Sequence, residues 1–88
     1  MQIVVKHHAS LQFWDAYNCL TPEIRQLADK NFDLLKRDSR HLSLQLKKTG
    51  RFWSARVGLG HRALAVECTD GLVWFWIGNH SDYDRLTT

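Results

Sequence analysis

One short apolar run constrains the fold more than any other part of the sequence. Residues 72–77 read LVWFWI, and Gly78 and Asn79 end the run at once. A membrane-spanning helix takes about 20 apolar residues, so a run of this length predicts a buried β-strand instead. His80 follows directly. We therefore expect the strand to hold a titratable imidazole rigidly at the edge of a packed sheet.

Size and composition indicate one globular domain over residues 1–88. The hydrophobic fraction is 44%, which is enough to build a core, and no repeat, linker or low-complexity segment divides the chain. Residues 1–5 lack the long apolar stretch of a signal peptide, so we expect a cytoplasmic protein without a membrane segment. Cys19 and Cys68 form no C-x-x-C pair and fall in a predicted helix and a predicted strand. Two buried thiols in a reducing compartment are expected, with a disulfide as the alternative.

The order of hydrophobic periods predicts the elements. Residues 2–7 read as a first strand. Ser10 is placed to cap a first helix, and Thr21 followed by Pro22 is a strong start for a second helix. Because almost nothing separates the two helices, they should form a hairpin. From residue 42 the period changes to two, which predicts strands over residues 42–47, 53–59, 61–69 and 72–77.

This order predicts an α+β fold. We expect the N-terminal strand and the helical hairpin to pack on one face of a twisted antiparallel sheet of about four to five strands. The opposite face of the sheet should then be open and able to receive a partner.

Charge is distributed unevenly along the chain. The net charge is +3, and no Asp or Glu occurs between Ser39 and Val66. RNA cleavage by its own 2′-hydroxyl needs a base for the 2′ proton, a cation for the crowded phosphorane and an acid for the leaving 5′ oxygen. The same surface would also suit an acidic protein partner. The side chains expected near the open face are Arg40, His41, Lys47, Lys48, Arg51, Arg56, His61, Arg62 and His80.

The histidines have simpler readings beside a catalytic one. His61 could be an ordinary residue at the end of a strand. A zinc site of His41, His61 and His80 has no support in their spacing, so we expect no metal ion and no cofactor. His7 and His8 are adjacent in a predicted strand. Their side chains should point to opposite faces, which makes it hard for them to share one metal ion.

Two segments resemble a known family. FWSARVGLGHRALAV (residues 52–66) and WIGNHSDYDRL (residues 76–86) are similar to the RelE/ParE superfamily of bacterial toxins, the toxin halves of type II toxin–antitoxin pairs. The helical hairpin fits the same layout, so the resemblance covers nearly the whole chain. It implies the RelE-like fold. For the branch of RelE, YoeB and YafQ, it also implies a ribonuclease that cuts messenger RNA in the ribosomal acceptor site.

The resemblance implies roles for the residues that match the family motifs. Arg62 matches a catalytic arginine, and His80 matches the general acid of YoeB-like and YafQ-like toxins. Tyr83 is the nearest match to an aromatic residue that is often functional. Basic residues that would contact RNA are Lys47, Lys48, Arg51 and Arg56.

One member of the family's catalytic set has no counterpart. YoeB-like toxins use a glutamate as base on the strand after the helices, and no acidic residue lies between Ser39 and Lys48. His41 or His61 would then have to take the proton, unless the chemistry depends on positioning and cations alone.

The leading prediction is a ribosome-dependent mRNA endoribonuclease toxin that inhibits translation. Its expected partners are a small antitoxin protein and mRNA in the ribosomal acceptor site, with no membrane. The alternative is a non-catalytic or gyrase-directed ParE-like toxin, or an inactive chain that only binds an antitoxin. The oligomeric state stays open between a homodimer and a toxin–antitoxin hetero-oligomer.

Overall fold

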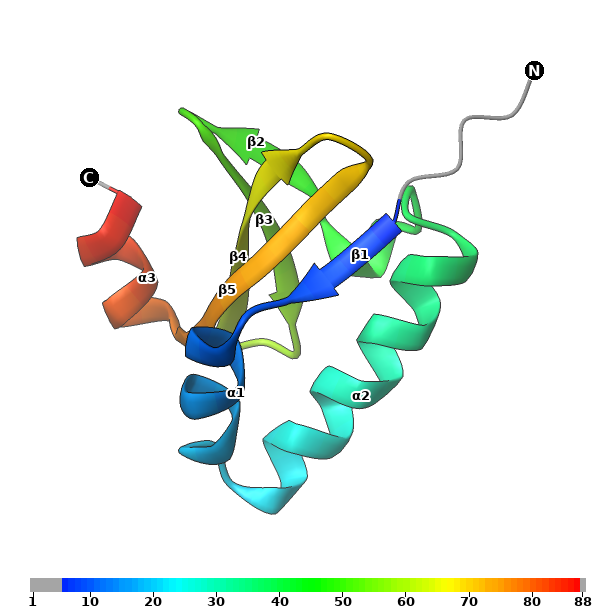
Figure 1. The fold of residues 1–88 in the computed structure, drawn as a ribbon. Helices are drawn as coiled ribbons and strands as arrows, with labels where there is room; N and C mark the ends of the chain where they lie inside the picture. Colours follow the sequence, from blue (N-terminus) through cyan, green and yellow to red (C-terminus); the bar gives the residue numbers. More distant parts are fainter. Residues whose placement is uncertain (1–5, 88) are drawn as a thin grey trace.

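The computed structural model describes residues 6–87, and within them it has three α-helices and one five-stranded sheet (Figure 1). The predicted α+β class is confirmed. No helix within these residues is both long and apolar enough to cross a membrane. In chain order the elements are β1 (Lys6–Ala9), α1 (Leu11–Asn18), α2 (Pro22–Arg37), the 3-10 helix η1 (Leu42–Leu44), β2 (Lys47–Thr49), β3 (Phe52–Val57), β4 (His61–Cys68), β5 (Gly71–Asn79) and α3 (His80–Thr87).

The sheet has the strand order β1-β5-β4-β3-β2. β3, β4 and β5 are antiparallel hairpin neighbours, as predicted, and β2 pairs with β3 in the same antiparallel way. β1 instead pairs with β5 in parallel, so the sheet is mixed. A parallel pair requires a long connection, and the whole chain from α1 to β4 lies between β1 and β5. The predicted first strand covered residues 2–7. Residues 2–5 lie outside the described part of the chain, and β1 continues to Ala9.

The helical hairpin forms for the local reasons that the sequence indicates. The Ser10 hydroxyl accepts a hydrogen bond from the backbone N–H of Phe13 at 3.3 Å, and the Thr21 hydroxyl accepts one from Ile24 at 3.4 Å. Pro22 occupies the first turn of α2, where its missing N–H costs nothing. The Asn31 side chain then donates to the Arg56 carbonyl at 3.0 Å and ties α2 to β3.

The sheet has two faces with different coverings. α1 and α2 cover what we call the hairpin face, where they pack on a core that includes Ala63, Ala65 and Trp74. Side chains alternate along a strand, so Arg62 and Leu64 point the other way. We call that side the α3 face, because Tyr83 of α3 lies over Arg62 there.

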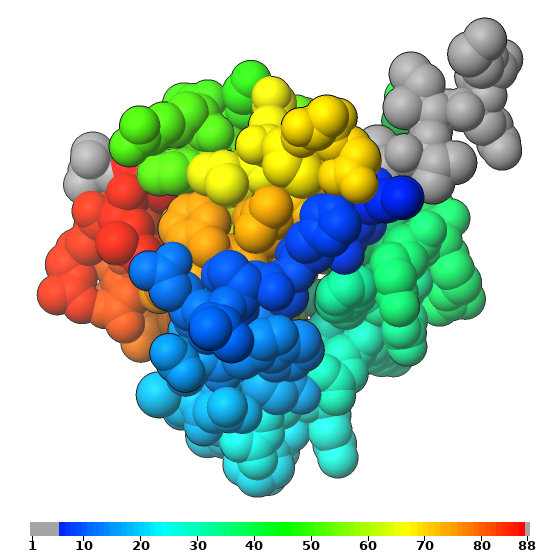
Figure 2. All heavy atoms as spheres, in the orientation of Figure 1, coloured from blue at the N-terminus to red at the C-terminus, as the bar shows by residue number. Residues whose placement is uncertain are grey.

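The α3 face is partly covered, which corrects the expectation of an open face. The Asn79 side chain accepts a hydrogen bond from the Asp82 N–H at 2.8 Å and starts α3 immediately after β5. Tyr83 is only 5% exposed. On the molecular surface, α3 (red) borders the end of β5 (orange) and the β2–β3 hairpin (green) (Figure 2). The free part of this face is therefore a region beside α3.

The predicted strand over residues 42–47 is wrong. Leu42–Leu44 form a 3-10 helix, because the His41 imidazole accepts a hydrogen bond from the Ser43 N–H at 3.2 Å. Gln45 then adopts a positive φ of 43°, and a strand begins only at Lys47. The alternation of leucines predicted that Leu42 and Leu44 would share one buried face of a strand. Leu44 is indeed 1% exposed, but Leu42 is 89% exposed.

The expectation of buried thiols is also wrong. Cys19 and Cys68 are both exposed and unpaired. Cys19 lies just beyond the last residue of α1, and Cys68 is the last residue of β4. Both thiols fall at the ends of elements, where the core no longer covers them.

A register shift decides which face the end of β5 presents. Leu64 pairs with Trp76 whereas Ala65 pairs with Trp74, so Phe75 is an extra residue opposite this step. Trp74 and Ile77 therefore both reach the core on the hairpin face. Trp76 shares the α3 face with Leu64. Without the bulge, β5 would turn one of these two core side chains to the α3 face.

The contact between β1 and the start of β5 predicts a specific sensitivity to side-chain volume. A Cβ atom at Gly71 would lie 2.0 Å from the Lys6 carbonyl oxygen, whereas a Cβ at Gly60 would meet nothing within 4 Å. We expect Gly71→Ala to lower the free energy of unfolding by about 1–3 kcal/mol, because backbone atoms must move apart. Gly60→Ala should change it by no more than about 0.5 kcal/mol. Urea unfolding followed by tryptophan fluorescence measures both, and equal losses would show that β1 does not need this close approach.

Candidate active site

The Arg62 guanidinium is the centre of the candidate site. Arg62 is 5% exposed, and its Nε donates to the Ser54 hydroxyl at 2.7 Å. Its Nη2 donates to the carbonyl of Gln45, the residue with the left-handed φ, at 3.1 Å. Burial lowers the pKa of Arg62 from its usual value, and the nearby Tyr83 opposes that effect. Arginine stays protonated in proteins, so the site holds a fixed positive charge.

Tyr83 covers this charge. The Arg62 guanidinium carbon lies 5.2 Å from the centre of the Tyr83 ring, a cation–π arrangement. Burial by itself raises the pKa of the Tyr83 hydroxyl. Hydrogen bonds with Ser54 and Thr49, together with the charges of Arg62 and Lys47, outweigh burial and leave that pKa below its usual value. Tyr83 is therefore a tyrosine with an increased tendency to give up its proton.

His80 lies beside Tyr83 and faces solvent. The two ring centres are 5.6 Å apart in an edge-to-face arrangement, and the His80 side chain is 55% exposed. Its Nδ1 lies 3.3 Å from a carboxylate oxygen of Asp84, one turn later in α3. The His80 backbone N–H donates to the Gly60 carbonyl at 2.9 Å, which fixes the residue to the β3–β4 turn. The imidazole is thus positioned between Tyr83 and Asp84 and remains accessible to a ligand.

The two neighbouring lysines of β2 point in opposite directions. Lys47 pairs with Ser54 on the α3 face, and its charge acts on the Tyr83 hydroxyl. Lys48 pairs with Trp53 on the hairpin face, where its ammonium lies 3.3 Å from a carboxylate oxygen of Glu67. Only Lys47 therefore adds positive charge to the candidate site.

The two predicted arginine contacts also differ. Arg56 lies directly opposite Arg62 in the β3–β4 register, and its Nε donates to the Gly58 carbonyl at 3.0 Å. Arg51 is exposed in the β2–β3 turn and lies over the Phe52 ring, 5.4 Å from its centre. Arg56 is therefore adjacent to the site, whereas Arg51 lies at the far end of β3.

Neither histidine predicted as the base joins this cluster. His61 precedes Arg62 in β4, so strand alternation directs its side chain toward the hairpin face. His41 caps η1, and its ring nitrogen lies 2.8 Å from the Ser43 hydroxyl. The groove that His41 borders also contains Trp53 and Glu67, at the opposite end of β4 from Arg62.

Three members of the site were missed by reasoning from the sequence. Ser54 and Thr49 lower the pKa of the Tyr83 hydroxyl, and a carboxylate oxygen of Asp84 lies 3.3 Å from Nδ1 of His80. Asp84 follows His80 by four residues, a spacing that places two side chains together on a helix, so a correct prediction of α3 would have found it. Ser54 and Thr49 carry no comparable signal, because their role depends on strand register.

Comparison with known proteins identifies the fold. No protein-family model and no curated protein matches the sequence. Among solved structures, the RelE–RelB antitoxin–toxin complex from Methanococcus jannaschii matches with a TM-score of 0.71 and 13% identity, over 92% of this chain and 99% of that chain. YafQ from Escherichia coli matches with a TM-score of 0.68 and 11% identity, over 90% and 97%. The YoeB–YefM complex from Staphylococcus aureus matches with a TM-score of 0.57 and 18% identity, over 86% and 97%.

These likenesses confirm the predicted fold. The chain has the RelE-like architecture that the resemblance in residues 52–66 and 76–86 implied, over nearly its full length. At such low identity the similarity concerns the backbone. The roles of individual side chains rest on the geometry described above.

The surroundings of the two tyrosines predict two separate ionisation steps. A hydrogen bond to Asp29 raises the pKa of Tyr17, while the environment of Tyr83 lowers its pKa. The chain has two tyrosines. We expect an ultraviolet phenolate titration to show one step below and one step above the usual value of about 10. Tyr83→Phe should abolish the earlier step and Tyr17→Phe the later one. Ser54→Ala should move the earlier step to higher pH, and a single shared midpoint would contradict this description of the site.

Proposed function

We propose that this chain is the toxin of a type II toxin–antitoxin pair and acts in the cytoplasm as a ribosome-dependent mRNA endoribonuclease. The observation that supports the proposal most strongly is the convergence of Arg62, Tyr83 and His80 at one end of the α3 face. These three groups can supply the positive charge, the base and the acid that cleavage of a phosphodiester uses.

The proposed chemistry assigns one role to each group. Tyr83, first deprotonated to the phenolate, takes the proton from the 2′-hydroxyl and becomes neutral, while the 2′ oxygen attacks the phosphorus. The bond from phosphorus to the 5′ oxygen then breaks, and protonated His80 gives its proton to that oxygen. The products are a 2′,3′-cyclic phosphate and a 5′-hydroxyl end. Tyr83 replaces His41 and His61 as the proposed base, because neither of those side chains is placed beside Arg62.

Lys47 and Arg62, the two cations of the site, differ in their exposure to solvent. Lys47 is exposed and meets the phosphate directly, whereas Arg62 lies beneath the Tyr83 ring. In the described arrangement Arg62 therefore acts on Tyr83, by holding its ring and stabilising the phenolate. A direct bond from Arg62 to phosphate would require the Tyr83 ring to move aside. Tyr83 is itself 5% exposed, so contact between its hydroxyl and the RNA also requires α3 to shift when RNA binds.

Burial of Arg62 also favours a second candidate function. A guanidinium that is 5% exposed could serve only to support α3, as in a non-catalytic toxin or a chain that binds an antitoxin without cutting RNA. In that case the cluster stabilises the fold, and His80 is dispensable. The two candidates share the antitoxin partner and differ in whether new RNA ends form.

An antitoxin has a suitable surface on the hairpin side. Leu11 of α1 is 84% exposed, and Trp14 and Leu27 of the same helical hairpin are also exposed. Exposed apolar side chains that gather in a patch are typical of a protein interface. We propose that the antitoxin lays a helix or an extended segment over these residues or over the basic α3 face. The toxin–antitoxin complexes from Methanococcus jannaschii and Staphylococcus aureus support a partner of this class.

A reconstituted translation reaction tests the proposed function. Ribosomes, a defined mRNA and the full chain are combined, and new RNA ends are mapped by sequencing. The wild type should produce cuts with 5′-hydroxyl ends inside translated codons, and only when ribosomes are present. His80→Ala should reduce the cleavage rate by about 10²–10⁴-fold, the usual contribution of a general acid. Tyr83→Phe should reduce it as well, while the circular dichroism spectrum stays unchanged.

Two matched pairs of variants sharpen this test. Lys47→Ala should weaken cleavage more than Lys48→Ala, because only Lys47 lies on the α3 face. His61→Ala should retain cleavage that His80→Ala loses. Cleavage that survives both His80→Ala and Tyr83→Phe would overturn the assigned roles. Growth arrest in cells without any new RNA ends would move the target to gyrase or another protein.

A further inference from the structure

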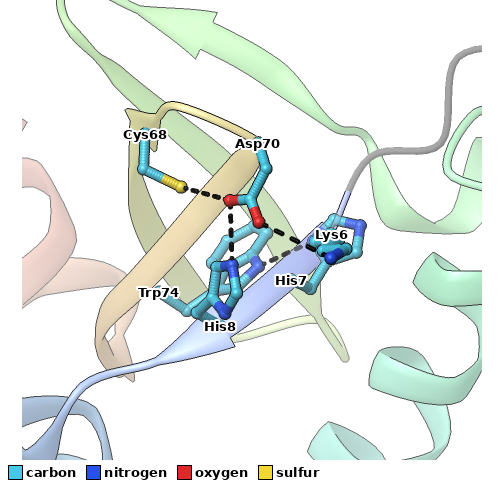
Figure 3. A network of polar contacts seen from close by, with 6 residues as sticks. All are labelled: Lys6, His7, His8, Cys68, Asp70 and Trp74. Carbon is cyan, nitrogen blue, oxygen red and sulfur yellow. Dashed lines mark hydrogen bonds and ion pairs between the residues drawn. The ribbon is translucent and has the colours of Figure 1, made fainter.

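A second cluster of reactive side chains lies at the opposite end of the sheet from Arg62. Asp70 Oδ1 lies 3.1 Å from His8 Nε2 and accepts a hydrogen bond from Cys68 Sγ at 3.3 Å (Figure 3). Within residues 6–87, this is the one group of three His, Cys, Asp or Glu side chains with all donor atoms within 4.8 Å of one another. The proposed RNA chemistry uses none of the three.

Backbone pairing holds the three residues in place. His8 lies in β1 opposite Val73, and Cys68 is the last residue of β4, opposite Gly71. Asp70 lies in the turn between β4 and β5, and its carbonyl accepts a hydrogen bond from the Lys6 N–H at 3.1 Å. The cluster therefore joins two segments distant in sequence, and β1 (dark blue) borders the turn (yellow) on the surface (Figure 2). Rigid strands position ligands better than flexible loops do.

Two of the three separations are close to what a tetrahedral zinc ion requires. Bonds of about 2.0–2.3 Å to nitrogen, oxygen and sulfur place neighbouring donor atoms about 3.3–3.6 Å apart. Two of the three separations are already 3.1 and 3.3 Å, and the third is no more than 4.8 Å. We propose that His8, Cys68 and Asp70 form a three-ligand site for Zn²⁺ that fastens β1 to the β4–β5 turn.

A metal ion could replace the hydrogens that now lie between the three side chains. Asp70 Oδ1 faces both Cys68 Sγ and His8 Nε2, so a cation bound by all three atoms would take the place of the hydrogens between them. On binding, the Cys68 thiol loses its proton to solvent, and neutral His8 offers Nε2 while its other nitrogen carries the hydrogen. Thiolate and carboxylate together balance the two positive charges of the ion. The proposal is independent of RNA cleavage.

Two neighbours limit the site. The Lys6 ammonium lies 3.9 Å from the other Asp70 oxygen, Oδ2, and leaves Oδ1 available to the proposed zinc ion. Its positive charge disfavours any further metal ion beside the first. His7, the neighbour of His8, points to the hairpin face and accepts a hydrogen bond from the Trp74 indole at 3.1 Å. It therefore cannot be the fourth ligand. All three proposed ligands are exposed, so the fourth position is open to water.

Zinc titration of the full chain, made without a histidine tag and kept reduced, tests the site. Isothermal calorimetry should give one Zn²⁺ per chain with a dissociation constant at or below about 1 μM. Co²⁺ as a spectroscopic probe should give the charge-transfer absorption of a cobalt–thiolate bond. Cys68→Ser and His8→Ala should lose the stoichiometric binding, and Asp70→Asn should weaken it. Zinc should raise the unfolding temperature of the wild type, and a chelator should reverse the increase.

Two control variants distinguish zinc bound at the proposed site from zinc bound elsewhere on the chain. Cys19→Ser removes the other exposed thiol, and His41→Ala removes an exposed imidazole elsewhere, so both should bind zinc as the wild type does. Absence of one-to-one binding, or binding that survives Cys68→Ser, would overturn the proposal. Loss of binding in Cys19→Ser would overturn it too, because the ion would then be bound elsewhere. Cys68→Ser preserves shape at an exposed position, and its circular dichroism spectrum verifies the fold.

Discussion

The buried guanidinium of Arg62 is the interaction on which the α3 face depends. A charge removed from water is costly unless its N–H groups and its charge find partners. Here the Ser54 hydroxyl and the Gln45 carbonyl accept hydrogen bonds from two N–H groups of Arg62, and the Tyr83 ring covers its charge. Ser54 belongs to β3, Gln45 caps η1 and Tyr83 belongs to α3, so these three elements must all be placed correctly against Arg62 of β4. The same contacts give Tyr83 its lowered pKa and place His80 beside it.

The two ends of the sheet carry different groups of interacting residues. At one end, the turn into β4 and the exit from β5 bring Arg62 and His80 together, and the Gly60 carbonyl links the two strands through the His80 N–H. At the other end, the β4–β5 turn meets the parallel edge strand β1 through Asp70. Only a residue without a Cβ allows that approach, since the Gly71 position lies so close to Lys6. The strands between these ends are covered by α1 and α2 on the hairpin face.

Much of the fold could be predicted from local pattern. Ser10, Thr21 and Pro22 mark the helix starts, because capping and the fixed φ of proline act within a few residues. The hairpin-linked strands from Phe52 onward follow from period-two alternation and turn residues. The failures also have local causes. The leucines of residues 42–46 alternate as in a strand, but the His41 cap and the left-handed Gln45 make a 3-10 turn.

The candidate site could be predicted less completely, for a physical reason. The sequence alone determined a basic segment without Asp or Glu, a strand closely followed by His80, and motifs that point to Arg62 and Tyr83. It could not separate Lys47 from Lys48, place His41, or find Ser54. Those outcomes depend on which side chains face each other across strands, and a shift of one residue in register reverses every face. Only the tertiary structure, through the bulge at Phe75 and the docking of α3, decided which cations, hydroxyls and imidazoles meet.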